Sequence, residues 1–270
     1  EGFGEGGVVD LMGQHRSRDG IDMVGSVGAS SPATVAGDVL VVGSAHHIGM
    51  RPPSKTNTPG DIRGYDAQSG ELLWTFKTIP EPGEFGVDTW ENESWSYTGN
   101  AAAWAPIAYD PESGFVYVPT EAATGDYYGG HRHGNNLFST SLVALDSRTG
   151  ERVWHFQTIH HDIWDWDNPT SPILADLTID GAPRKIVAQI TKQGFVFVFD
   201  RLTGDPIWPI EERAVPQTDI PGEWTSPTQP IPTKPLPFEP QGFSEDDLID
   251  FTPEIKARAA EIASAYRMGP

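Results

Sequence analysis

Cysteine is absent from this 270-residue chain, and basic residues are scarce. Without a thiol, the chain has no disulfide, no zinc–thiolate site and no cysteine nucleophile. Its 18 Lys and Arg residues stand against 38 Asp and Glu residues, which gives a formal net charge of −20. This balance argues against a nucleic-acid partner, which requires a basic face, and against docking on an anionic membrane surface.

Long hydrophobic runs are missing as well. No stretch approaches the ~18 apolar residues of a membrane-spanning helix, and no signal peptide is visible. The chain opens at Glu1 rather than at Met and ends abruptly at Pro270. We therefore expect it to be a piece of a longer protein, so the missing signal peptide says little about location.

The residues that are abundant favour a turn-rich β protein. The chain contains 29 Gly and 24 Pro, which is unlike a helical bundle, together with nine Trp. A hydrophobic fraction of 37% and an aromatic fraction of 10% are enough for a packed core and exclude a disordered chain.

An internal repeat predicts the architecture. Residues 66–74, 146–154 and 200–208 share the pattern D-x3-G-x3-W. Strand-like residues precede each Asp, the Asp accepts backbone N–H groups within a tight turn, and the Gly supplies a positive φ. Each unit is therefore predicted to be a strand, a turn and a returning strand that carries the Trp, and we expect these Trp side chains to pack between repeats.

Further strand signals turn each unit into a four-stranded blade. They occur at residues 39–42, 115–118 and 186–188, and residues 195–199 are apolar on both faces, as in a strand buried between stacked sheets. The predicted fold is an all-β propeller with blades at 31–78, 102–158 and 170–211, after an N-terminal extension or partial blade at 1–30. A β-sandwich is the alternative. Three to four blades cannot close a ring, so a fragment of a larger propeller follows.

Three connecting segments complete the organisation. Residues 79–101 form an insertion long enough to be functional, and residues 212–243 form a proline-rich connection with little regular structure expected. Residues 244–270 form a helical segment. Its helix is predicted to start at Thr252 and Pro253 and to run to Arg267, with an apolar face that packs on a neighbour. That face consists of Ile255, Ala259, Ile262 and Tyr266.

The chemistry concentrates in the loop at 159–169, whose letters 160–167 are HHDIWDWD. Three carboxylates so close together repel one another unless a cation, hydrogen bonds or solvent intervene. One explanation is a hard divalent metal with oxygen ligands. Another is a carboxylate whose raised pKa suits a general base. A solvated acidic turn anchored by its Trp residues is the third.

At this level the sequence resembles the pyrroloquinoline quinone (PQQ)-dependent dehydrogenases, in particular the membrane-type quinoprotein glucose dehydrogenase branch. The resemblance rests on the three D-x3-G-x3-W repeats and on the HHDIWDWD loop with Lys192 27 residues beyond Asp165. It covers about residues 30–240 and includes residues 60–66, 104–106, 124–126 and the SPTQP motif at 226–230. The family fold is an eight-bladed propeller with PQQ and a metal, usually Ca²⁺ (or Mg²⁺), on its axis.

The resemblance also implies roles for individual residues. Asp165 matches the catalytic base and is a candidate metal ligand, and Lys192 matches the basic residue that hydrogen-bonds the quinone oxygens. Thr124 matches a threonine beside cofactor and metal, and Trp104 matches the indole floor under PQQ. His160 and His161 are candidates to orient Asp165 or to contact substrate. Asp162 is a weaker candidate and, like Asp167, is expected to cap turns or order the loop.

One part of the sequence departs from the family pattern. Residues 43–51, where the family places a carboxylate or an Asp-Asn pair that helps to hold the metal, contain no acid, and the next acidic residue is Asp61. Metal ligands are therefore expected from the loop at 90–95, or from Asp165 together with the cofactor alone.

The resemblance implies oxidation of a sugar (glucose-like) or other alcohol or polyol hydroxyl, with electrons passed to a quinone or cytochrome. It places the protein in the periplasm, bound to or facing the inner membrane. An acidic surface suits a basic cytochrome partner, although solubility alone also explains it. The alternatives are a noncatalytic PQQ-like propeller that serves as a binding scaffold, and a quinate or simple alcohol dehydrogenase on the same fold. A scaffold needs neither a buried base nor a quinone-facing cation.

Overall fold

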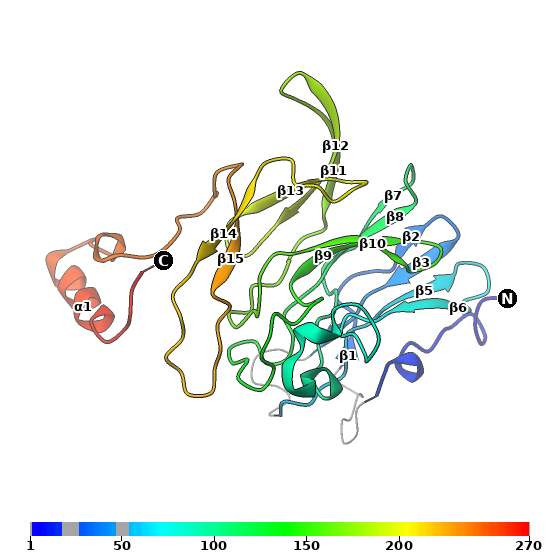
Figure 1. Ribbon diagram of the computed structural model, residues 1–270, viewed down its shortest axis with the longest axis horizontal. Coiled ribbons are helices and arrows are strands. Elements are labelled where there is room, and N and C mark those ends of the chain that lie inside the picture. The colour runs from blue at the N-terminus through cyan, green and yellow to red at the C-terminus, as the bar shows by residue number, and fades with distance from the viewer. Residues whose placement is uncertain (1, 18–26, 47–53, 270) are drawn as a thin grey trace.

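The computed structural model describes residues 2–17, 27–46 and 54–269. Figure 1 shows its main sheets arranged side by side, as blades are in a propeller. The first blade has the strand order β2-β3-β5-β6 and the second has β10-β9-β8-β7, all antiparallel. Their strands are β2 (Thr34–Ala36), β3 (Val39–Val42), β5 (Ile62–Asp66), β6 (Leu72–Phe76), β7 (Ala108–Asp110), β8 (Phe115–Pro119), β9 (Ser141–Asp146) and β10 (Arg152–Gln157).

The repeated turns form as the sequence predicts. One carboxylate oxygen of Asp66, Asp146 and Asp200 accepts hydrogen bonds from the backbone N–H groups two and three residues later, at 2.6–3.1 Å. The Gly of each repeat adopts a positive φ between 71° and 78°. The Asp therefore holds the turn closed, and Gly is the residue that reaches this backbone conformation without strain.

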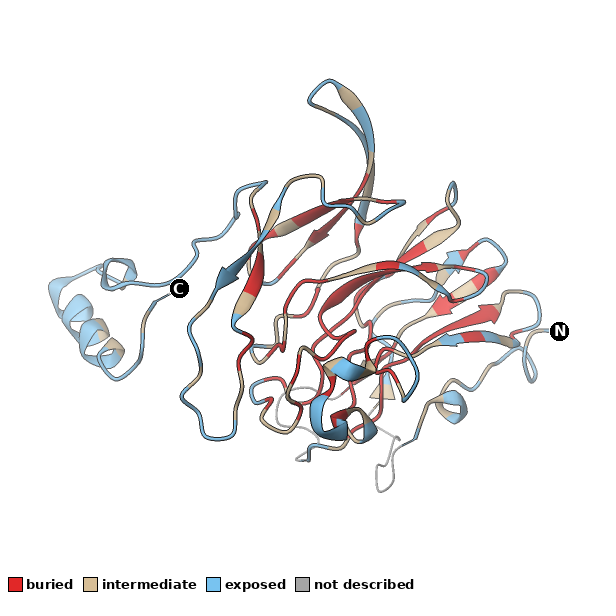
Figure 2. Ribbon diagram, viewed as in Figure 1, coloured by how far each residue is buried: buried red, intermediate tan, exposed pale blue. Residues whose placement is uncertain are grey.

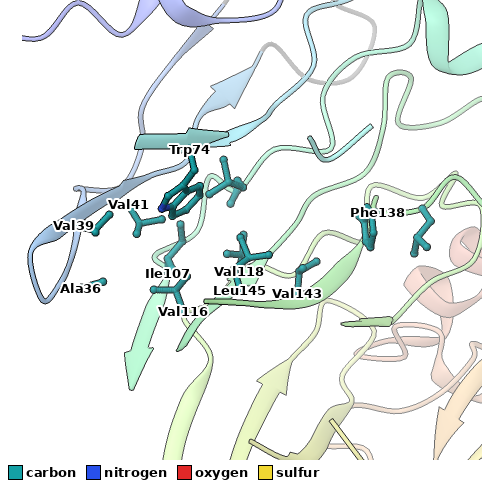
Figure 3. Packing of buried hydrophobic residues seen from close by; sticks show 13 residues of the cluster. Ala36, Val39, Val41, Trp74, Ile107, Val116, Val118, Phe138, Val143 and Leu145 are labelled. Atoms are coloured by element: carbon teal, nitrogen blue, oxygen red, sulfur yellow. The ribbon is translucent and has the colours of Figure 1, made fainter. Parts of the chain in front are cut away.

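The Trp of one repeat packs on the turn of the next blade. The indole of Trp74 covers the α-carbon of Gly150, where an added Cβ would lie 2.5 Å from Trp74 Cδ2, and its Nε1 donates to the carbonyl of Ser147 at 3.0 Å. Figure 3 shows Trp74 beside the apolar residues of both blades, among them Val41 and Val116. The expectation that the repeat Trp residues pack between repeats is confirmed here for Trp74.

The second interface repeats this arrangement. Trp154 covers Gly204, and its Nε1 donates to the carbonyl of Arg201 at 3.1 Å. The third sheet, β11 (Ile173–Ile179), β12 (Ala182–Ile190) and β13 (Val196–Asp200), supplies Phe197 and Phe199 to the same core. Both Phe residues are fully buried, and Val198 on the opposite face of the strand is also buried. The prediction of a strand buried on both faces is confirmed.

The third repeat corrects two predictions. Its expected returning strand around Trp208 does not form in the described chain, since only an isolated bridge joins Phe199 to Pro206 and the sheet has three strands. Pro206 and Pro209 flank Trp208 and have no N–H to donate to a strand partner. The connection at 212–243 is more regular than predicted, because β14 (Ile210–Ala214) pairs with β15 (Thr228–Pro232).

The C-terminal helix also differs from its prediction. Helix α1 (Pro253–Ala263) begins as expected, with the Thr252 hydroxyl oxygen accepting from the N–H of Ile255 at 3.2 Å, but it ends before Arg267. Its apolar face does not pack on a described neighbour, because Ile255, Ile262 and Tyr266 are exposed. Figure 2 shows helix α1 mostly in the colour of exposed residues. Figure 1 shows α1 apart from the sheets. The sequence pattern therefore predicted the helix correctly, but not a partner for its apolar face.

The remaining elements are short, and all but η4 lie near the first blade. They are η1 (Met12–Gln14), β1 (Val27–Gly28) paired with β4 (Ala45–His46), η2 (Val87–Thr89) and η3 (Glu91–Ser96) in the predicted insertion, and η4 (Glu245–Asp247) before α1. Arg16 fixes the N-terminal segment through two hydrogen bonds to the buried Asp61, at 2.5 and 2.6 Å. None of the helices in the described chain is long and apolar enough to cross a membrane.

Candidate active site

The structure brings Asp165 and Lys192 into contact from two separate segments. Asp165 lies in the loop after β10, and Lys192 lies in the turn between β12 and β13. Lys192 Nζ donates to the Asp165 carbonyl at 2.7 Å and lies 3.3 Å from its carboxylate Oδ2. The side chains keep 30% and 19% of their exposure, so both remain open to a ligand. The paired acid and cation predicted from the sequence are therefore neighbours in space.

Asp167 joins this pair to Trp104. Its Oδ2 accepts from Lys192 Nζ at 2.9 Å and from Trp104 Nε1 at 3.1 Å, and its Oδ1 accepts from the Ala122 N–H at 2.8 Å. Three donors on a buried carboxylate fix the ammonium and the indole relative to each other. From the sequence, Asp167 was expected only to cap a turn or to order the loop. Its place as the third acid of HHDIWDWD was the one signal of this role.

The surroundings of Asp165 raise the pKa of its carboxyl. Partial burial is the largest cause and the negative charge of Asp167 adds to it, whereas Lys192 opposes both. Asp165 adopts a positive φ of 57° between Trp164 and Trp166, whose rings stack with centroids 5.1 Å apart. A partly exposed carboxylate with a raised pKa, held beside a cation, is suited to accept a proton.

Asp162 orders the loop, as predicted. Its carboxylate accepts from the backbone N–H of Trp164 at 2.9 Å, from the N–H of Trp166 at 3.0 Å and from the hydroxyl of Thr140 at 2.9 Å. These bonds fix the backbone on both sides of Asp165. Asp162 is fully buried, and burial raises its pKa to about 6 from the ordinary value of 3.8.

The raised pKa of Asp162 makes stability depend on pH. Between about pH 4 and pH 6, the folded protein binds a proton here that the unfolded chain has lost, so the free energy of unfolding falls as pH rises through this window. Asp162→Asn removes this titration. The variant's free energy of unfolding relative to wild type should improve by about 2–3 kcal/mol from pH 4 to pH 7 in urea titrations. A difference that is flat with pH would contradict the assignment.

Thr124 lies in a separate polar cluster. Its hydroxyl accepts from Asn57 Nδ2 at 3.2 Å and donates to Asn100 Oδ1 at 3.1 Å, and the two amides also bond to each other at 2.5 Å. All three residues are buried. Thr124 was predicted from the resemblance, whereas Asn57 and Asn100 carry no local pattern that predicts their place here. The described chain shows no hydrogen bond from this cluster to Asp165 or Lys192.

The two histidines bond to residues other than Asp165. His160 contacts Gln157 at 2.9 Å through Nδ1 and Glu212 at 3.2 Å through Nε2. His161 is buried, and its Nε2 lies 3.1 Å from Glu223 Oε1. Over the part of the chain that the structure describes, neither imidazole hydrogen-bonds to Asp165. The predicted direct orienting contact is therefore not formed.

The metal ligands remain a prediction. Among the described residues, no three His, Asp or Glu side chains converge as a metal site. In the insertion at 90–95, Glu91 and Glu93 are exposed on η3, and residues 47–53 lie outside the described residues. A residue that sequence analysis missed is Glu121, which is buried 3.7 Å from His46 and accepts from the Ala102 N–H. Burial, with Asp167 second, raises its pKa well above the usual range.

The residues present fit a flat, anionic aromatic cofactor. Trp104 is partly exposed, and its indole is held in place by the hydrogen bond to Asp167. Lys192 Nζ lies 5.9 Å from the centroid of the same ring. An aromatic surface with a fixed cation at its side matches a quinone that carries carboxylates, since the ring stacks on the indole and the anionic oxygens meet the ammonium.

Comparison with known proteins gives the same result. Residues 1–270 match the PQQ family described as glucose/ethanol/alcohol dehydrogenase, beta-propeller domain. The quinoprotein glucose dehydrogenase of Escherichia coli is 38% identical over 180 residues, which are 66% of this chain and 22% of that protein. The glycerol dehydrogenase large subunit of Gluconobacter oxydans is 38% identical over 256 residues, 94% of this chain and 33% of that protein.

A solved structure agrees with these relatives. A quinohemoprotein alcohol dehydrogenase from Pseudomonas putida matches with a TM-score of 0.57 and 31% identity, over 68% of this chain and 28% of that chain. The chain thus spans a third or less of the length of these relatives. The repeats, the sheets and the family match agree that this chain belongs to the β-propeller family of PQQ-dependent dehydrogenases.

Proposed function

We propose that this chain supplies the catalytic base and the quinone-facing cation of a PQQ-dependent dehydrogenase that oxidises a sugar or other alcohol or polyol hydroxyl. The observation that supports the proposal most is the contact between Asp165 and Lys192, which are 27 residues apart, with Trp104 joined to Lys192 through Asp167. A binding scaffold has no need for a raised-pKa carboxylate beside a fixed cation. The catalytic proposal is therefore favoured over the scaffold.

The chemistry of each side chain follows from its surroundings. Asp165 accepts the hydroxyl proton of the substrate at a carboxylate oxygen, and its positive φ and fixed neighbours keep that oxygen in place. Burial lowers the pKa of Lys192, but the neighbouring carboxylates of Asp167 and Asp165 raise it by more, so its pKa lies above the usual value. Lys192 therefore keeps its proton at Nζ and offers N–H donors to anionic oxygens. PQQ, when bound, supplies the hydride acceptor.

Other residues hold the ligands. Trp104 would form the floor under the cofactor ring, and Thr124 would contribute its hydroxyl at the edge, close to the metal. The family implies a divalent metal, which we propose to be Ca²⁺ (or Mg²⁺) with Asp165 among its ligands. Such an ion favours oxygen donors and would polarise the substrate hydroxyl.

The substrate class and the setting are inferred from the relatives. They are named for glucose and for glycerol, which supports a sugar or polyol; a quinate or a simple alcohol is the alternative. We infer that electrons pass to a quinone or cytochrome and that the protein works in the periplasm, associated with the inner membrane. The formal charge of −20 suits a basic acceptor protein.

Dye reduction by the intact protein tests the proposed function. Purified apoprotein is given PQQ and Ca²⁺, and an artificial acceptor is followed with glucose, other aldoses, glycerol, quinate and ethanol. We expect turnover that requires both PQQ and substrate, with the best substrate among the sugars and polyols. Absence of PQQ binding to a folded protein would overturn the proposal and favour the scaffold.

Lys192→Ala should slow reduction of the bound cofactor at least tenfold, about 1.4 kcal/mol on the barrier. The substitution removes the cation that meets anionic oxygens, and it also removes the opposing charge beside Asp165. Stopped-flow absorbance of the cofactor measures the rate. Lys185→Ala is the matched control, because Lys185 lies on β12 and pairs with the exposed Glu112. Equal rates in Lys192→Ala and wild type would make Lys192 a structural residue.

A further inference from the structure

Two residues of the proline-rich connection at 212–243, Gln229 and Glu223, bind the start of the active-site loop. Gln229 on β15 bonds to the backbone of His160 in both directions. The His160 N–H donates to Gln229 Oε1 at 2.8 Å, and Gln229 Nε2 donates to the His160 carbonyl at 2.7 Å. The Gln229 side chain therefore takes the place of a strand partner. Because it is 6% exposed, these bonds are shielded from water.

Glu223 binds the next residue of the loop, His161. Its Oε1 lies 3.1 Å from His161 Nε2, and both side chains are almost completely buried, at 2% and 0% exposure. Glu223 is itself fixed, because Oε2 accepts from the Gly129 N–H at 2.5 Å and Oε1 accepts from the Trp224 N–H at 2.8 Å. The ring of Trp224 meets the imidazole edge-on, with centroids 4.9 Å apart. We call Glu223 and Gln229 the clasp.

The seat of His161 is built to hold it in one position. Its Nδ1 lies 2.9 Å from the Gly134 carbonyl and its Nε2 lies 3.1 Å from Glu223 Oε1, so an acceptor oxygen stands beside each ring nitrogen and a neutral ring donates to one of them. Gly129 lies directly against the ring: an added Cβ would stand 2.6 Å from His161 Nε2, with no room for it. An imidazole so enclosed has little freedom to move, and neither has the backbone that carries it.

The connection that carries the clasp is anchored in turn. Besides the pairing of β14 with β15, the Tyr128 hydroxyl donates to the Pro221 carbonyl at 3.3 Å and His133 Nε2 lies 2.9 Å from the Gly222 carbonyl. These contacts tie residues 221–222 to the segment at 124–136. The segment that carries Glu223 and Gln229 is therefore itself held in place by its neighbours.

The contacts of Glu223 and Gln229 act on Asp165 through the short stretch of backbone from His160 to Asp165. Asp162 follows His161 directly and holds the N–H groups of Trp164 and Trp166 on either side of Asp165. Arg132 adds a buried bridge, because it donates to the Asp162 carbonyl at 2.5 Å and to Asn136 Oδ1 at 2.7 Å. The far end of the loop is held by Lys192 on Asp167. With both ends of the loop fixed, the backbone that carries Asp165 is held in place.

We propose that Glu223 and Gln229 are positioning residues that fix the active-site loop, and with it the base Asp165, from the proline-rich connection. The inference rests on the proposed function of Asp165 as the base. Neither clasp residue touches the reacting atoms. Their effect is to keep Asp165 at the geometry that proton transfer requires, which predicts a loss in kcat rather than in substrate binding.

The test uses two isosteric variants of the full-length protein. Glu223→Gln replaces one carboxylate oxygen with an NH₂ group that then faces an N–H donor, and Gln229→Glu replaces the Nε2 donor with an oxygen that faces the His160 carbonyl. Glu211→Gln is the control, since Glu211 lies exposed on the neighbouring strand β14. Two quantities are measured: hydrogen–deuterium exchange of residues 160–167 without cofactor, and kcat and KM with PQQ and Ca²⁺.

We expect both clasp variants to speed exchange in residues 160–167 at least tenfold and to lower kcat about tenfold, with KM within twofold of wild type and exchange in β8 and β9 unchanged. The control should change neither quantity. Exchange in 160–167 that stays at the wild-type rate in both folded variants would overturn the proposal, and so would faster exchange with an unchanged kcat. If wild type shows no PQQ-dependent turnover, the proposed function fails, while the exchange data still decide whether the clasp holds the loop.

Discussion

Asp165→Asn should lower kcat by about a thousandfold, within the range that a positioned general base contributes. Asn has nearly the same shape as Asp and tolerates the positive φ of 57° at this position. It keeps the backbone carbonyl that accepts from Lys192 at 2.7 Å. The loop should therefore stay in place, while the group that takes the substrate proton is lost.

The measurement is dye-linked turnover together with PQQ binding, which should change little. A matched control is Asp180→Asn, because Asp180 also has a positive φ, of 51°, but lies in the turn between β11 and β12. Turnover near the wild-type value in Asp165→Asn would show that the base is misassigned. Glu121 would then be the next candidate, since its carboxyl is buried and its pKa is strongly raised.

The blades were predictable because their signals are local. An Asp that caps its own turn, a Gly at positive φ and a Trp at a fixed distance depend only on residues within nine positions. The residues that determine each turn lie within its own repeat, and the recurrence of the pattern three times strengthens the prediction. Where an added local signal interrupted the pattern, as Pro206 and Pro209 do around Trp208, the expected strand was lost.

The site was only partly predictable, for the opposite reason. The loop with Asp165 and its partner Lys192 was predicted from a family motif, in which residues at a fixed spacing in the sequence lie close together in the fold. No spacing announces that Asp167 joins Trp104 to Lys192. Such contacts arise from how separate blades meet, and sequence periodicity describes one element at a time.

The connection at 212–243 shows the same limit. Its many Pro residues argue against helix and strand interiors, yet five residue pairs join β14 to β15. The Pro230 carbonyl can still accept, and a two-stranded hairpin tolerates a missing donor on an outer edge. The contact of Gln229 with His160 spans 69 positions along the chain, so the hairpin's role became visible only in three dimensions.

The largest expected loss of stability comes from Trp74→Ala, at about 3–5 kcal/mol in the free energy of unfolding. Trp74 is 8% exposed and lies in the core between the first and second blades. The substitution leaves a cavity against Gly150 and removes the hydrogen bond to the Ser147 carbonyl. Gly150 has no side chain with which to refill the space, so relaxation recovers little of the loss.

Urea unfolding followed by far-ultraviolet circular dichroism measures this loss, with Leu73→Ala as the control. Leu73 precedes Trp74 on the same strand, points to the other face and is 46% exposed, so its truncation should cost well under 1 kcal/mol. A near-neutral Trp74→Ala would mean that the indole does not hold the two blades together, and the repeat would then be a turn motif alone. A loss in the expected range would show that the Trp of the first repeat stabilises the contact between neighbouring blades, and Trp154 covers Gly204 of the next turn in the same way.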